Sequence, residues 1–183
     1  LSAEQKQRKQ VLAGDLRVAQ KAFDAFLHEM RVNFALSGPA RAADIADLNG
    51  EAVSALQTLI KGLGHDAVLL QYYVTDDQVG MLLTTPGVQL ARSTKVNAKN
   101  LNRQIAEFRR LLRDPKSDLL PASQALYQLL VAPVAKDLEQ AGAKTVMLSL
   151  DGALRYLPFG ALHDGQRYLV QRWNLPMYTS VTK

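Results

Sequence analysis

The stretch from 146 to 180 constrains the fold more than any other part of the chain, because strand, turn and helix signals follow one another closely in it. An apolar run over 146–150 is typical of a buried strand, and it stops at Asp151-Gly152, a pair suited to a turn with a positive φ. A short apolar piece over 154–159 then resembles a helix. After a second Asp-Gly pair at 164–165, a last alternating run closes the block. The pattern predicts a strand, a turn, a short helical piece and another extended segment.

The sequence before this block predicts helices around a sheet. Strand-like runs occur at 67–75, 79–85 and 88–93. The turn-forming pairs between them, Asp76-Asp77 and Pro86-Gly87, are too short for anything but antiparallel neighbours, so these runs predict a meander. Two helical patterns precede the strand at 144–150. One covers 97–112 and is capped by Asn97, and the other begins at Pro121, restarts at Pro133 and ends at Gly142. Helices between separated strands imply crossovers and a parallel sheet. We therefore expect helices around a sheet that combines the antiparallel meander with parallel strands.

A long helix is predicted over 4–36, ahead of the sheet. Its apolar residues recur at alternating spacings of four and three, which places them on one stripe: Leu12, Leu16, Ala19, Phe23, Phe26, Met30 and Phe34. The stripe fits a helix that packs on a neighbour, and a functional seam is the alternative. A second helix is expected over 50–61, with Asn49 as its N-cap and Val53, Leu56, Leu59 and Ile60 facing inward. We expect residues 1–48 to form a helical connector and 49–183 a separate domain.

Composition excludes several classes of protein. The 183 residues contain no cysteine, so they hold no disulfide framework, no cysteinate metal site and no cysteine nucleophile. No window is long and apolar enough to span a bilayer, and no signal peptide is visible, so we expect no membrane association. The absence of cysteine fits a reducing compartment, and we expect a cytoplasmic protein.

Positive charge is concentrated in one segment, 91–116. Eight basic residues lie there against two acidic residues, Glu107 and Asp114: Arg92, Lys95, Lys99, Arg103, Arg109, Arg110, Arg113 and Lys116. The segment is either a patch for an acidic partner or nucleic acid, or the solvated face of one helix. Phe108 is the only aromatic residue among the basic ones, so base stacking is not supported and we do not expect a nucleic-acid partner.

No catalytic or metal-binding constellation is visible. His28, His65 and His163 share no metal-ligand spacing and none has a cysteine or activated serine nearby. Asp76-Asp77 could be read as a metal pair, but turn formation is the better interpretation, because adjacent side chains of a turn diverge. Nucleophile-elbow, phosphate-loop and dinucleotide motifs are absent. We therefore predict no catalytic, cofactor-binding or metal-binding residue in this chain, and no cofactor.

The C-terminal motifs resemble the CHAT domain, the caspase-like domain found after tetratricopeptide repeats in many bacterial proteins. The residues over 151–162 read DG-x-L-x-x-LPF-x-AL, and those over 126–133 read LY-x-x-L-x-x-P. Tyr168-Leu169 and Trp173 resemble the segment that leads to the family's Pro-Ser pair, where Thr179 replaces the proline. The resemblance covers roughly residues 51–180 and is most specific toward the C-terminus. Within it, Leu157 and Phe159 are predicted to anchor the 3-residue LPF element into the sheet.

This resemblance implies a caspase-like α/β sandwich, with a mainly parallel sheet and helices on both faces. It also implies a parent protein that is a cysteine endopeptidase. The family's catalytic histidine, in a His-Gly pair, and its cysteine lie beyond the segment present, so no catalytic residue carries over. The chain would be an incomplete scaffold, inactive alone, with a protein or peptide substrate and with the C-terminal remainder of the domain as a partner. The alternative is a non-enzymatic interaction module on the same scaffold. The downstream sequence would distinguish the two.

Overall fold

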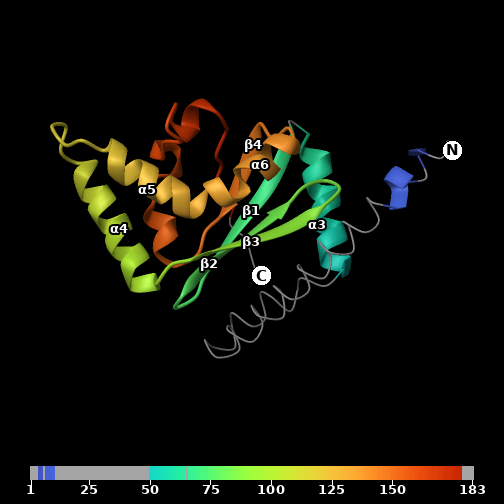
Figure 1. The fold of residues 1–183 in the computed structure, drawn as a ribbon, viewed down its shortest axis with the longest axis horizontal. Helices are drawn as coiled ribbons and strands as arrows, with labels where there is room; N and C mark the ends of the chain where they lie inside the picture. Colours follow the sequence, from blue (N-terminus) through green and yellow to red (C-terminus); the bar gives the residue numbers. More distant parts are fainter. Residues whose placement is uncertain (1–3, 6, 11–49, 65, 179–183) are drawn as a thin grey trace. The chain divides into compact units, whose positions relative to one another are not determined.

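The computed structural model describes residues 4–5, 7–10, 50–64 and 66–178 (Figure 1). The chain divides into two compact units, Leu1–Ala52 and Val53–Lys183. In the first unit, residues 4–5 and 7–10 are helical and exposed. The rest of the helix predicted over 4–36, with its apolar stripe, lies outside the described residues, and so does Asn49. The domain boundary between residues 48 and 49 stays a prediction.

The second unit is built on a four-stranded sheet in the order β3-β2-β1-β4. Its strands are β1 (Ala67–Val74), β2 (Gln78–Thr84), β3 (Gln89–Lys95) and β4 (Thr145–Ser149). Strand β1 pairs with β2, and β2 with β3, in the predicted antiparallel meander, while β1 pairs with β4 in parallel. The register sets Leu70 opposite both Leu83 of β2 and Leu148 of β4.

The expectation of a mainly parallel sheet is wrong for the described residues. Only one of the three strand pairs, β1 with β4, is parallel. The reason is the connections: two short turns join β1, β2 and β3, and short turns return the chain antiparallel. A single helical crossover, through α4 (Ala98–Leu111), α5 (Leu120–Leu130) and α6 (Ala132–Gln140), separates β3 from β4. The protein therefore has a mixed α/β fold with an open, mostly antiparallel sheet.

Helices α4, α5 and α6 pack on one face of the sheet and form the main core with it (Figure 1). Helix α4 begins after Asn97, whose side chain accepts a hydrogen bond from the Lys99 N–H at 3.0 Å, as the sequence predicts. Leu101, Ile105 and Phe108 of α4 are buried, whereas Leu112, also predicted to face inward, is 37% exposed because the helix has already ended.

Helix α3 (Gly50–Leu63) covers part of the opposite face. Its Ile60 packs with Ala67, Leu69 and Met147, and Leu56 lies against the same small cluster. Leu59, predicted to face inward, is instead 51% exposed. Strand β1 is buried on both faces in its first half, as its continuous apolar sequence predicts.

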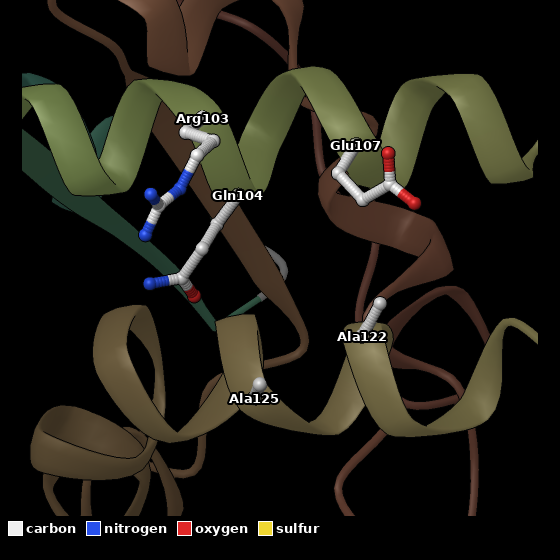
Figure 2. A pocket seen from close by; sticks show the side chains of 5 residues that line it. All are labelled: Arg103, Gln104, Glu107, Ala122 and Ala125. Atoms are coloured by element: carbon white, nitrogen blue, oxygen red, sulfur yellow. The ribbon is translucent and has the colours of Figure 1, made fainter.

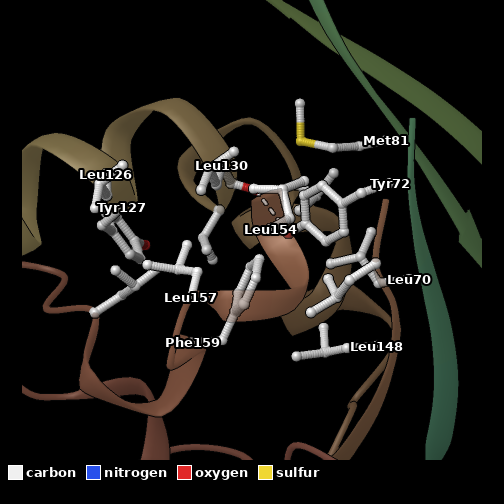
Figure 3. Packing of buried hydrophobic residues seen from close by; sticks show 14 of the residues in the cluster. Leu70, Tyr72, Met81, Leu126, Tyr127, Leu130, Leu148, Leu154, Leu157 and Phe159 are labelled. Atoms are coloured by element: carbon white, nitrogen blue, oxygen red, sulfur yellow. Dashed lines mark hydrogen bonds between the residues drawn. The ribbon is translucent and has the colours of Figure 1, made fainter. Parts of the chain in front are cut away.

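After β4 the chain forms three short 3₁₀ helices in place of the single helical piece predicted. They are η1 (Gly152–Tyr156), η2 (Phe159–Ala161) and η3 (Leu169–Gln171). Leu157 and Phe159 are each 4% exposed, and the Phe159 ring lies 5.3 Å from the ring of Tyr72 (Figure 3). The LPF element therefore anchors this segment to the sheet, as predicted.

The segment 174–178 runs parallel to β4 on the side away from β1. The N–H groups of Asn174 and Tyr178 donate to the carbonyls of Lys144 and Leu148, and the carbonyls of Asn174 and Pro176 accept from β4 in return. Isolated parallel bridges join Thr145 to Asn174 and Leu148 to Met177. The last alternating run of the sequence thus extends the sheet by a short parallel element beyond β4.

Candidate functional site at the carboxyl edge of the parallel strands

The carboxyl ends of β1 and β4 are tied together by a side chain that follows β4. The backbone N–H of Val74, the last residue of β1, donates to Oδ2 of Asp151 at 3.2 Å. Asp151 is half-buried and stands directly before η1. Ligands of open parallel sheets bind outside the carboxyl ends of the strands, so this edge is the first candidate for a functional site.

The loop that carries Asp151 is shaped by two backbone features. Gly152 has φ +53°, the left-handed conformation that the Asp-Gly pair predicts. Arg155 folds back, and its Nε donates to the carbonyl of Leu150 at 2.9 Å. The Asp151 carboxylate thus bonds the loop to β1, and the Arg155 guanidinium bonds it to the residue that follows β4. This arrangement positions a backbone; it contains no nucleophile.

The turn between β1 and β2 lies at the same edge. Asp76 and Asp77 are exposed, and their carbonyls accept hydrogen bonds from the N–H groups of Ala98 and Val96 at 2.9 and 3.0 Å. Oδ1 of Asp77 also accepts from the Thr75 hydroxyl at 3.0 Å. The pair therefore belongs to a turn that supports the start of α4, as predicted. Across the described ranges, no three His, Asp or Glu side chains gather into a metal site.

A second polar cluster surrounds the second Asp-Gly pair. Nδ1 of His163 accepts a hydrogen bond from the Gly165 N–H at 3.0 Å, and the imidazole packs edge-on against Tyr168. Oδ1 of Asp164 accepts from the N–H groups of Gln166 and Arg167 at 2.7 and 2.8 Å. These bonds close a turn, so His163 has the turn role predicted for it.

Arg172 connects that turn to helix α6. Its guanidinium pairs with Glu139 and lies 3.5 Å from Oδ2 of Asp164, and it covers the ring of the buried Trp173 at 4.4 Å. Desolvation raises the pKa of nearby Tyr127, and the charge of Asp164 raises it further. The cluster fastens the segment after η2 to α6. His28, His65 and Ser180 lie outside the described residues, and the half-buried Ser149 ends β4.

A groove of about 380 Å³ lies between α4 and α5 (Figure 2). Its walls are Arg103, Gln104 and Glu107 of α4, which face Ala122 and Ala125 of α5. The helices and the charge of this region were predicted from the sequence, but the groove was not. The signal is the pair of alanines three residues apart on α5, which leaves the helix surface low where longer side chains would fill it.

Residues 120–183 match the model of the CHAT domain. The match spans α5, α6, β4 and the three 3₁₀ helices, together with the loop that carries Asp151. The match is consistent with a partial CHAT domain in the C-terminal portion of this chain, where the motifs over 126–133 and 151–162 lie.

The other comparisons add little. No curated protein matches the sequence. One similar solved structure is a "PilM-PilN type IV pilus biogenesis complex", 20% identical, with a TM-score of 0.32. The aligned region covers 79% of this chain and 47% of that one, so this chain spans about half its length. A TM-score this low supports no conclusion. A search of the described helices for one long and apolar enough to cross a membrane finds none.

Proposed function

We propose that this chain is the scaffold portion of a caspase-like cysteine peptidase of the CHAT family. The match of residues 120–183 to the CHAT domain carries the proposal. The sheet supports it, because β1, β4 and the segment 174–178 run parallel and end at one edge. The Asp151 loop and the turn after β1 stand at that edge, and open α/β sheets bind their ligands outside the carboxyl ends of parallel strands.

The reaction proposed for the whole protein is hydrolysis of a peptide bond. A cysteine thiolate attacks the carbonyl carbon, and a histidine takes and returns the protons. This sequence contains no cysteine, and the turn of His163 engages its Nδ1. We therefore expect the cysteine of the dyad to come from residues outside 1–183, and we expect these residues alone to hydrolyse nothing. A thiolate works only while it is reduced, so the proposal includes a cytoplasmic location.

The partner that completes the fold is proposed to be the remainder of the same domain. Within the described residues, the N–H and C=O groups of Leu175 and Met177 make no hydrogen bond, since residues 174, 176 and 178 make the bonds to β4. The Met177 side chain is 54% exposed. An unpaired edge of this kind is a template for another strand.

The test uses two forms of the protein, residues 1–183 and a longer form continued through the sequence encoded after Lys183. Both are treated with a thiol-reactive peptidyl acyloxymethyl ketone and analysed by mass spectrometry. We expect labelling of one cysteine in the longer form, lost when that cysteine is replaced by alanine. We expect amide hydrolysis only in the longer form. Hydrolysis by residues 1–183 alone would overturn the scaffold role. A longer form that folds but neither labels nor hydrolyses would favour the non-enzymatic interaction module.

A further inference from the structure

We infer that the groove between α4 and α5 binds a short acidic segment of a protein partner. This binding site is independent of the peptidase proposal, because it uses neither the carboxyl edge of the sheet nor any residue of the Asp151 loop. The segment would place apolar side chains against Ala122 and Ala125 and carboxylates beside Lys99 and Arg103.

The α5 side of the groove, called its floor below, carries only short apolar side chains. Ala125 is exposed and Ala122 is half-buried, and both lie on the side of α5 that faces α4 (Figure 2). Because no lining side chain on this floor is longer than a methyl group, an incoming chain can come close to the α5 backbone. An amphipathic segment that lies in such a groove buries its apolar face there.

The rim of the groove is positive on one side only. Lys99, Arg103 and Arg110 stand four and seven residues apart on α4, which puts them on one stripe of the helix. Helix α5 (LPASQALYQLL) contains no charged residue, so it offers no acidic group to neutralise them across the groove. The only acidic lining residue, Glu107, is held by Arg110 through two hydrogen bonds of 2.7 and 2.9 Å.

Two cations beside the groove are left without an acidic partner. Arg103 donates only to the neutral side chain of Asn100, at 2.8 Å, and no ion pair joins Lys99 or Arg103 to any acid in the described part of the chain. The two are thus available to carboxylates of a ligand. A single exposed ion pair contributes little, so affinity requires the apolar floor as well as the charges.

The same features favour a protein over nucleic acid. Binding to single-stranded nucleic acid relies on aromatic side chains on which bases stack. Phe108 is the only aromatic residue of α4, and its side chain is fully buried in the core. The alanine floor also offers no donor to a phosphate.

The test measures fluorescence anisotropy of a labelled probe peptide on the chain of residues 1–183. The probe has about 14 residues, the length of α4, with leucine and alanine on one helical face and glutamate on the other. We expect saturable binding that Arg103→Glu weakens at least tenfold. Ala125→Trp, which fills the groove from an exposed position, should weaken it similarly. Lys116→Glu is the matched control, because it reverses the same charge in the loop after α4, and it should change affinity less than twofold.

Each outcome decides the proposal. No binding by the wild-type chain overturns it, and so does equal weakening by Arg103→Glu and Lys116→Glu, because that would be attraction by net charge alone. A fluorescent duplex DNA that binds as tightly as the peptide, with both weakened by Arg103→Glu, would assign the surface to nucleic acid instead. Circular dichroism establishes that each variant is folded. Peptidase activity of a longer form plays no part in the measurement, so this proposal and the proposed function can fail separately.

Discussion

The N–H of Val74 and Oδ2 of Asp151, 3.2 Å apart, join two residues that are 77 positions apart in the chain. The bond fixes the carboxyl ends of β1 and β4 to each other, beyond the last register pair of the two strands, Gln71 with Ser149. It also holds the loop that leads from β4 into η1 at the edge of the sheet where the proposed substrate would lie.

Replacement of Asp151 by alanine should destabilise the second unit. The N–H of Val74 would lose its acceptor, a loss of about 1–3 kcal/mol in the free energy of unfolding. Asp151→Asn retains an amide oxygen at the same place and should lose less than the alanine variant. Urea denaturation of the three proteins measures the difference. Equal stability of the wild-type and alanine proteins would mean that the bond does not contribute to holding the edge.

Replacement of Phe159 by alanine should be among the most destabilising changes in the chain. Its ring is 4% exposed and packs against Tyr72, so its loss leaves a cavity that costs about 3–5 kcal/mol. Leu59→Ala is the control, because Leu59 is 51% exposed, and it should cost well under half as much. Chemical denaturation compares the two. An unchanged midpoint for Phe159→Ala would refute the anchoring role of the LPF element.

Tyr72→Phe isolates one buried hydrogen bond. The Tyr72 hydroxyl donates to the carbonyl of Leu130 at 2.8 Å (Figure 3), and its removal should cost about 1–2 kcal/mol. Burial raises the pKa of this phenol above its ordinary value of 10.0. In the unfolded chain the phenol ionises near pH 10, so stability should fall as the pH rises above 10.

The Tyr72→Phe variant should therefore lose less stability than the wild type between pH 9 and 11. Tyr156→Phe, at an exposed position, should keep the wild-type dependence. Denaturation midpoints at each pH test both statements, and identical pH profiles for the wild type and Tyr72→Phe would contradict them.

Asp164 should contribute to stability against acid. Burial acts to raise the pKa of its carboxyl group. Hydrogen bonds from the N–H groups of Arg167 and Gln166, together with the positive charges of Arg172 and Arg167, outweigh this and lower the pKa below 3.8. A depressed pKa in the folded state gives stability that is present above pH 3.8 and is lost as the pH falls through the lower value. Asp164→Asn should therefore show a shallower fall in stability below pH 4. A fall as steep as that of the wild type would contradict the assignment.

The sequence predicted turns and helix starts well, because these depend on residues that are neighbours in the chain. The turn pairs at 76–77 and 86–87 predicted the meander, Asn97 predicted the start of α4, and Pro121 and Pro133 lie in the first turns of α5 and α6. The Asp-Gly pairs also mark positive φ at Gly152 and Gly165.

Features that depend on distant residues could not be read in advance. The bond from Val74 to Asp151 requires knowledge of which strand lies beside β1, and the groove requires knowledge of which face of α5 meets α4. The expectation of a mainly parallel sheet failed for a related reason. Helices between strands predict a crossover, but only one crossover joins described strands, so the sheet has one parallel pair.

The central claim is that the segment 174–178 is the edge at which the sheet continues. Amide hydrogen exchange tests this claim most directly. In residues 1–183, the N–H groups of Leu175 and Met177 should exchange quickly and those of Asn174 and Tyr178, which bond to β4, more slowly. In the longer form, the Leu175 and Met177 N–H groups should become protected. Protection of both in residues 1–183 alone, or continued fast exchange in the folded longer form, would contradict the account.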